Sequence, residues 1–169
     1  IFCSCIHTFM DIDGKTYKVS DLMRPAVVIP ENAKLKDVLA ALVDAQSNIA
    51  VVVDEDGKLA GAVSTLDVIR AVLPDYLEAD VVAARFADDK MFKEDALKAA
   101  ELPITEFVDR HEAAVSPDDD LVAAAALSSK ECHGRIIVLD EERRPVGILT
   151  RTEIKRALAT FLGIRDDLS

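Results

Sequence analysis

Two short motifs combine side chains that could bind a small polar ligand. Ser64 is followed three residues later by Asp67, and Thr150 is followed at the same distance by Glu153. At the start of a helix, the hydroxyl and the unpaired amide groups favour a phosphate or another oxygen as ligand. The same spacing is that of the helix capping box, which needs no ligand. From the spacing alone, we favour the cap.

Basic residues are concentrated around the second of these motifs. The whole chain has 20 Lys and Arg against 31 Asp and Glu, a formal net charge of −11, yet residues 130–165 contain eight basic and five acidic residues. We expect phosphates to bind in such a region, because a focused positive potential attracts anions. Within this region, Arg151 directly follows Thr150, and Arg135 stands at the start of a strongly apolar run.

Composition excludes several classes of partner. The net charge of −11 argues against binding to a nucleic-acid polymer and to an anionic membrane surface. No apolar run approaches the ~20 residues that span a bilayer. Aromatic residues make up 5% of the chain, so stacking platforms are scarce. The three cysteines are too few for a disulfide framework, and a reducing cytoplasm is the expected location.

Metal-binding and catalytic motifs are weak. Cys3, Cys5 and His7 are possible zinc ligands but lack a fourth ligand and the usual spacing. The acidic clusters at 88–89 and 118–120 leave a divalent-metal sensor as a minor alternative, although such runs are more often solvated loops. The sequence has no Gly-rich phosphate loop, His-Glu-x-x-His motif or nucleophile elbow. We therefore expect neither an enzyme nor a required metal or cofactor.

The chain repeats itself at an offset of 86 residues. Residues 35–71 align without a gap with residues 121–157, so that Val52 matches Val138. Upstream, small differences in loop length shift the offset to 87 or 85. A unit of about 55 residues buries little surface, and we expect the two copies to pack together into one module.

Hydrophobic periodicity predicts the order strand, helix, strand, strand, helix in each unit. For the first unit we expect strands over 26–29, 49–53 and 59–63, a helix over 35–43, and a helix from Ser64 to about Leu73. The dipeptide Asp56-Gly57 is typical of a hairpin turn in which both central residues have positive φ.

Two further segments lie outside the repeated units. Residues 75–102 space apolar side chains among acids and are interpreted as one or two amphipathic helices. Residues 1–10 begin without Met and have no basic region, and we interpret them as a leader or a vector-derived extension ahead of a start at Met10.

This arrangement resembles a tandem pair of cystathionine β-synthase (CBS) domains, also called a Bateman module. The resemblance covers residues 19–73 and 104–161. It rests on the segments Ser20-Asp21-Leu22-Met23, Val28-Ile29-Pro30, Val52-Val53-Asp54 and Gly57-Lys58-Leu59-Ala60-Gly61, and on the repeated Gly-x-x-Ser/Thr-x-x-Asp/Glu motif. It implies an α+β fold of two β-α-β-β-α repeats with pseudo-two-fold symmetry, a helical insert over 75–102, two clefts between the repeats, and homodimers.

The resemblance also implies a regulatory function rather than catalysis. Relatives of this kind bind an adenosine-containing ligand such as AMP, ADP, ATP or S-adenosylmethionine in an inter-repeat cleft, and we expect a conformational signal to an unidentified protein. Asp67 would accept the ribose hydroxyls, and apolar strand residues would enclose the adenine. Glu153 is one methylene longer than the Asp of the family, which weakens the case for the second cleft. The alternative is a dimerising interaction module with empty clefts, whose partner surface is 75–102.

The candidate ligand-binding residues implied in this way are Val28, Ile29, Ile49, Ala50, Val51, Ser64, Asp67, Val115, Arg135, Ile136, Thr150, Arg151 and Glu153.

Overall fold

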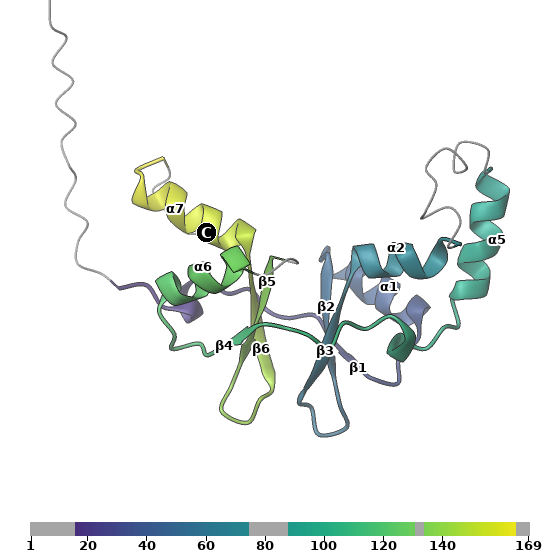
Figure 1. The fold of residues 1–169 in the computed structure, drawn as a ribbon, viewed down its shortest axis with the longest axis horizontal. Coiled ribbons are helices and arrows are strands. Elements are labelled where there is room, and N and C mark those ends of the chain that lie inside the picture. The colour runs from purple at the N-terminus through teal and green to yellow at the C-terminus, as the bar shows by residue number, and fades with distance from the viewer. Residues whose placement is uncertain (1–15, 75–87, 131–133, 165–169) are drawn as a thin grey trace, which may run out of the picture.

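Two three-stranded sheets, each covered on one face by helices, form the core of the molecule (Figure 1). The structure is a computed structural model that describes residues 16–74, 88–130 and 134–164. Within these ranges the fold is α+β, with one sheet and one pair of helices in each repeat and a helix between the repeats. The predicted fold class is confirmed.

The first repeat has the expected order of elements. Its elements are β1 (Val28–Pro30), α1 (Leu35–Asp44), β2 (Ile49–Val53), β3 (Leu59–Ser64) and α2 (Thr65–Val72). Strand β1 is parallel to β2, and β2 is antiparallel to β3. The continuous apolar run of β2 is buried because helices cover one face of the sheet and the second sheet covers the other.

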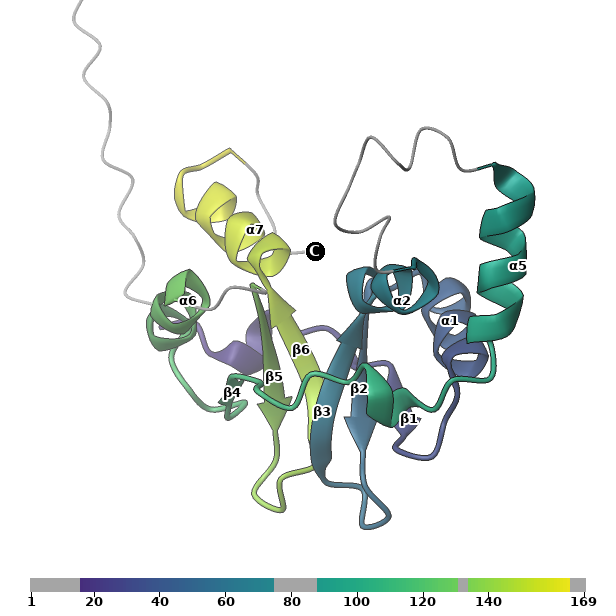
Figure 2. The ribbon, with the colours of Figure 1, turned by 45° about the vertical axis from the view of Figure 1, so that its right-hand side comes forward.

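The second repeat has the same topology. Its elements are β4 (Ala114–Val115), α6 (Leu121–Lys130), β5 (Arg135–Leu139), β6 (Pro145–Thr150) and α7 (Arg151–Phe161). Helix α5 (Asp89–Ala99) lies between the repeats in sequence and packs beside α2 (Figure 2). The expected helical segment 75–102 is therefore helical over α5, and its residues 75–87 lie outside the described residues.

The two sheets pack against each other in the middle of the module. Val51 and Ala62 of the first repeat form a buried cluster with Ile137 and Ile148 of the second. The neighbouring residue Val52 points the other way, into the core beneath α1 and α2, as the two-residue period of a strand requires. Each half thus buries two faces of its sheet, one of them against the other half.

The segments that precede β1 and β4 are exchanged between the repeats. Val19, in the short 3-10 helix Val19–Asp21, lies in the core of the second repeat, while Ile104, in the 3-10 helix Ile104–Glu106, lies in the core of the first. Arg24 then forms an antiparallel bridge with Ile148, and Asp109 forms one with Ala62. Neither core is therefore complete without residues from outside its own repeat.

Glycines in the repeated motif permit this exchange. A Cβ on Gly61 would collide with the carbonyl oxygen of Asp109, and a Cβ on Gly147 would lie 2.8 Å from Met23 Sδ and 2.9 Å from the carbonyl oxygen of Arg24. Both glycines are explained by the close passage of an exchanged segment.

The prediction of two positive φ angles in the Asp56-Gly57 turn is wrong. Gly57 has a φ of +77°, but Asp56 is not among the residues with positive φ. The connection is longer than a two-residue turn because the Asp54 carboxylate accepts hydrogen bonds from the amides of Asp56 (3.0 Å) and Lys58 (2.8 Å). In the second repeat Arg143, with a φ of +65°, occupies the position of Gly57.

Candidate functional site

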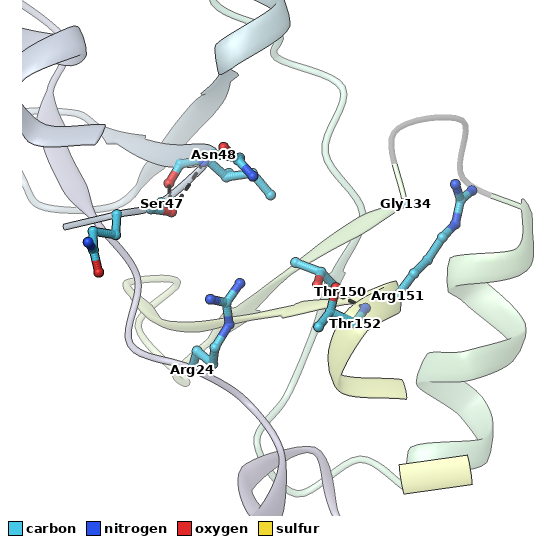
Figure 3. A pocket seen from close by; sticks show the side chains of 9 residues that line it. Arg24, Ser47, Asn48, Gly134, Thr150, Arg151 and Thr152 are labelled. Atoms are coloured by element: carbon cyan, nitrogen blue, oxygen red, sulfur yellow. Dashed lines mark hydrogen bonds between the residues drawn. The ribbon is translucent and has the colours of Figure 1, made fainter. Parts of the chain in front are cut away.

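A pocket of about 300 Å³ lies between the two repeats (Figure 3). This volume is at the lower end of the range for small-molecule sites. The pocket is lined by Gln46, Ser47, Asn48 and Ile49 of the first repeat, by Gly134, Thr150, Arg151 and Thr152 of the second, and by Arg24 of the exchanged N-terminal segment.

The start of α7 forms one wall of the pocket. Thr150 donates hydrogen bonds from its hydroxyl (2.5 Å) and its amide (2.9 Å) to Glu153 Oε2, and its Oγ1 accepts one from the amide of Thr152 (3.2 Å). This is the predicted capping box. The amide of Arg151 donates to the carbonyl oxygen of Gly134 (3.3 Å). Because these amides are already paired, an anion in the pocket must be bound chiefly by side chains.

Two arginines provide the positive charge of the pocket. The guanidinium of Arg24 extends toward Asn48 (Figure 3), and its Nε lies 2.7 Å from Glu153 Oε1. The Glu153 side chain is 3% exposed and that of Arg24 is 46% exposed. Their contact is an ion pair without hydrogen-bond geometry, and Oε1 accepts no hydrogen bond from the described residues. Glu153 therefore holds Arg24 at the pocket electrostatically.

Arg151 reaches the other end of the pocket over Gly134. A Cβ on Gly134 would lie 2.7 Å from Cζ of Arg151, and the φ of this glycine is +63°. Glycine is thus favoured here by the backbone conformation, and the absence of a Cβ leaves room for the guanidinium to lie over it.

The loop from α1 to β2 forms the opposite wall. Ser47 fixes its shape, because the hydroxyl donates to the carbonyl oxygen of Ile49 (2.9 Å) and accepts from the Ile49 amide (3.2 Å). The carbonyl oxygen of Asn48 accepts a hydrogen bond from the Thr65 amide, which ties the loop to the start of α2. Ile49 contributes apolar surface to an otherwise polar lining.

Arg135 lies at a second place between the repeats. Its Nε donates to both carboxylate oxygens of Glu112, at 3.0 and 3.1 Å, and its Nη2 donates to Glu112 Oε1 and lies 3.5 Å from Asp109 Oδ2. Burial alone would lower the pKa of Arg135, but the hydrogen bonds and charge of Glu112, together with the charges of Asp67 and Asp109, raise it. Arg135 is therefore held as a cation by an acidic surrounding.

The first capping box lies beside this second place. Asp67 Oδ2 accepts hydrogen bonds from the amide (2.8 Å) and the hydroxyl (2.6 Å) of Ser64, and Ser64 Oγ accepts one from the Asp67 amide (3.3 Å). The cap predicted from the spacing is present here as well.

The structure brings together only some of the predicted site residues. Ile49, Thr150 and Arg151 line the pocket, and Glu153 lies behind it. Ser64, Asp67 and Arg135 belong to the second place. The other predicted residues lie in β1, β2, β4 and β5. Three of them are fully buried (Ala50, Val51 and Ile136) and Ile29 is nearly so. Val115 is partly buried, and Val28 is 47% exposed.

Sequence reasoning did not identify most of the pocket. The lining residues it missed are Arg24, Gln46, Ser47, Asn48, Gly134 and Thr152. The polar run 46–48, directly before a buried strand, was an available signal. Arg24 had none, because it reaches the pocket only through the exchange of the N-terminal segment.

Three residues of the acidic clusters have structural partners. Asp88 caps α5 by accepting from the Met91 amide (2.8 Å), Asp119 accepts from the Ser116 amide (2.8 Å), and Asp120 pairs with Lys18 (2.6 Å). Among residues 16–74, 88–130 and 134–164, no three His, Cys, Asp or Glu side chains are placed to hold a metal ion. Cys3, Cys5 and His7 lie outside these ranges. In the same ranges, no helix has the length and hydropathy needed to cross a membrane.

Comparison with known sequences identifies relatives of this chain. The family model of the CBS domain matches residues 19–74 and 100–160. The uncharacterized protein MJ1426 of Methanocaldococcus jannaschii is 27% identical over 162 residues, which are 88% of this chain and 95% of that protein. Of four further relatives, this chain spans between 24% and 43% of the length.

Solved structures show the same fold. CBSX2 from Arabidopsis thaliana has a TM-score of 0.69 at 22% identity, with 90% of this chain and 99% of that chain covered. The CBS domain pair of protein MJ0100, in complex with 5′-methylthioadenosine and S-adenosyl-L-methionine, has a TM-score of 0.65 at 23% identity, with 89% and 100% covered. CBSX2 in complex with AMP has a TM-score of 0.63 at 24% identity, with 88% and 98% covered. With its two matched repeats, the chain belongs to the CBS domain family and folds as a CBS-domain pair.

Proposed function

We propose that this CBS-domain pair is a regulatory module that binds a phosphate-bearing adenosine ligand, with AMP the simplest, in the pocket between its repeats. The observation that carries this proposal is a pocket between the repeats that Arg24 and Arg151 line from opposite ends. Structural relatives solved with AMP, or with 5′-methylthioadenosine and S-adenosyl-L-methionine, support an adenosine compound as ligand.

The charge of the pocket favours a phosphate over a sulfonium ligand. Arg24, which is paired with Glu153, and Arg151 both line the pocket, whereas its described lining includes no Asp or Glu. A guanidinium binds phosphate through two parallel hydrogen bonds, whereas it would repel the positive sulfur of S-adenosylmethionine. We therefore rank AMP, ADP and ATP above S-adenosylmethionine.

Each wall of the pocket has a role in this proposal. Arg151 and the Thr152 hydroxyl bind the phosphate at one end of the pocket, and Glu153 is a positioning residue that holds Arg24 at the other end. Ile49 packs against the adenine, and Asn48 offers an amide to the ribose or the base. Because these residues come from both repeats and from an exchanged segment, a bound ligand stabilises one arrangement of the two halves. That arrangement is the signal to a partner protein in the cytoplasm, where adenine nucleotides are available.

Calorimetric titration with AMP, adenosine and S-adenosylmethionine tests the proposal. We expect saturable binding of AMP and a melting temperature that rises with AMP concentration. Arg151→Ala removes charge-assisted hydrogen bonds and should weaken AMP binding about ten- to a hundred-fold while leaving adenosine binding unchanged. Arg156→Ala, on the exposed surface of α7 away from the pocket, is the matched control. Absence of binding by all three ligands would overturn the proposal.

A second candidate function, a dimerising interaction module, is favoured by apolar side chains on the helices. Exposed residues of this kind are Leu39 and Val43 on α1, Leu66 and Ile69 on α2, Val122 on α6, and Leu158 and Phe161 on α7. Their occurrence on equivalent helices of both repeats suits a second copy of the chain, which would present the same helices. Sedimentation velocity should then show a dimer that Leu66→Asp dissociates, and a nucleotide-free function would leave this dimer unchanged by AMP.

A further inference from the structure

The surroundings of Arg135 are the pseudo-symmetric counterpart of the pocket. Ile49, which lines the pocket, pairs with Ser64 across β2 and β3, and Arg135 pairs with Thr150 across β5 and β6 in the same register. The exchanged segments correspond as well, because Arg24 bridges to Ile148 of β6 and Asp109 bridges to Ala62 of β3. The molecule therefore contains two equivalent places, one of which is the pocket.

At the second place, the carboxylate of Glu112 forms a buried ion pair with Arg135. The side chains of Arg135 and Glu112 are each 3% exposed, and Glu112 binds the guanidinium through both carboxylate oxygens. Arginine holds a phosphate by the same planar, two-pronged hydrogen bonding. Glu112 thus satisfies Arg135 in the way that an anionic ligand would.

The connection that carries Glu112 has no equivalent carboxylate in the first repeat. From the bridge at Arg24 to the first β1 pair at Val28 the chain advances four positions, whereas from Asp109 to the first β4 pair at Ala114 it advances five. The shorter connection is Pro25-Ala26-Val27, which is entirely apolar. The longer connection contains one additional residue, and it places Glu112 between the repeats.

We propose that Glu112 occupies the anion position of a second ligand site at Arg135, so that the chain takes one phosphate-bearing ligand and not two. The identity of that ligand rests on the function proposed above, whereas the anion site at Arg135 does not. Removal of the Glu112 carboxylate should open this second site.

The stoichiometry of AMP binding tests the proposal. Calorimetry should give one equivalent of AMP per chain for the native protein and two for Glu112→Ala. The matched control is Glu31→Ala, because Glu31 also pairs with an arginine, Arg110 (2.7 Å), but that pair is exposed. It should bind one equivalent. A single equivalent for Glu112→Ala, with one equivalent for the native protein, would overturn this inference and leave the proposed function intact.

Rescue by a small anion provides a readout that does not depend on AMP. In anion-poor buffer the melting temperature of Glu112→Ala should be below that of the native protein, and acetate or inorganic phosphate should raise it by more than it raises that of the native protein. The double variant Glu112→Leu with Arg135→Met, which lacks both members of the buried ion pair, should show no such response. Equal responses of Glu112→Ala and the double variant would contradict an anion site at Arg135.

A variant closer in shape covers the case in which Glu112→Ala does not fold. Glu112→Gln retains the size and a hydrogen-bond acceptor but loses the charge. Inorganic phosphate should stabilise Glu112→Gln more than the native protein, and an identical response would count against the proposal. If the native protein binds no AMP but Glu112→Ala is rescued by acetate, the proposed function fails and the anion site stands.

Discussion

The two places between the repeats share a backbone frame and differ in charge. Each has a capping box at the start of a helix, a glycine in the adjacent strand, and an exchanged segment that crosses that strand. At the pocket, two arginines line one space, and Arg24 pairs with Glu153. At Arg135, one guanidinium is surrounded by Glu112, Asp109 and Asp67. The repeat thus defines where a ligand could bind, and the side chains of the exchanged segments decide whether the place is open.

Burial separates the two ion pairs further. The Arg24 side chain is 46% exposed beside a buried Glu153, whereas Arg135 and Glu112 are both buried. An exposed cation can exchange its partner for a ligand at little cost, but a buried pair cannot lose one member without leaving a desolvated charge. The open place is therefore suited to an exchangeable ligand and the closed place to a permanent internal one.

The largest expected effect is the loss of stability when Arg135, the cation of the buried ion pair, is removed. Removal of Arg24, the exposed cation at the pocket, should cost less. Arg135→Ala leaves Glu112 buried without a partner and should lower the free energy of unfolding by about 3–5 kcal/mol. Arg24→Ala leaves Glu153 within reach of water entering the pocket and should cost about 1–2 kcal/mol. Urea unfolding measures both, and equal losses would contradict the difference in burial between the two pairs.

The glycines test how closely each exchanged segment passes its strand. Gly61→Ala drives a Cβ into the backbone of Asp109 and should cost about 3 kcal/mol, the upper end for overpacking. Gly147→Ala places its Cβ 2.8 Å from the movable Met23 side chain and 2.9 Å from the Arg24 carbonyl oxygen, a milder clash, and should cost about 1–2 kcal/mol. The free energies of unfolding should fall in that order, and the reverse order would mean that the segment before β1 is held more rigidly than the segment before β4.

The capping residues separate the structural role of the motif from its ligand role. Ser64→Ala and Thr150→Ala each remove a cap and should lower the free energy of unfolding by about 1 kcal/mol. Only Thr150→Ala should also weaken AMP binding, because Thr150 lines the pocket and Ser64 does not. Thermal unfolding with and without AMP measures both effects. Weakened AMP binding in Ser64→Ala would place the ligand at Arg135 instead.

The repeat made the fold predictable, and helical spacing made both capping boxes predictable. Apolar runs such as 49–53 and the pairs Ser64 with Asp67 and Thr150 with Glu153 are local features, so their structure follows from neighbouring residues. The Asp56-Gly57 turn shows the limit of a local signal, since the carboxylate of Asp54 selects a longer connection.

The charge distribution between the repeats could not be predicted from the sequence. Arg24 reaches the pocket and Asp109 reaches Arg135 because the segments that carry them are exchanged, and no sequence period records an exchange. Glu112 lies in a polar run that is typical of a solvated loop, yet its side chain is 3% exposed. Arg135 and Arg151 looked alike as candidates in a basic region, and only the fold shows that Arg135 is buried against the carboxylate of Glu112.

The smallest expected effect on stability comes from the exposed ion pairs near the starts of the two exchanged segments. Glu101, after α5, pairs with Lys34 (2.5 Å) and Lys36 at the start of α1, while at the start of the N-terminal segment Lys18 pairs with Asp120. The hydrogen bonds from Lys34 and Lys36 lower the pKa of Glu101 from 4.5 to about 2.

Because the pKa of Glu101 is lowered in the folded protein, its contribution to stability is present above pH 4.5 and is lost as the pH falls toward 2. The urea midpoint of the native protein should therefore fall more steeply over this interval than that of Glu101→Gln. The difference should be small and should vanish in 1 M salt, since all three side chains are about half exposed and salt screens exposed charges. Lys18→Gln, which breaks the pair with Asp120 at the other segment, should leave the acid slope due to Glu101 unchanged. If Lys18→Gln reduced the fall of the urea midpoint with pH as much as Glu101→Gln does, the ion pairs of the two segments would not act independently.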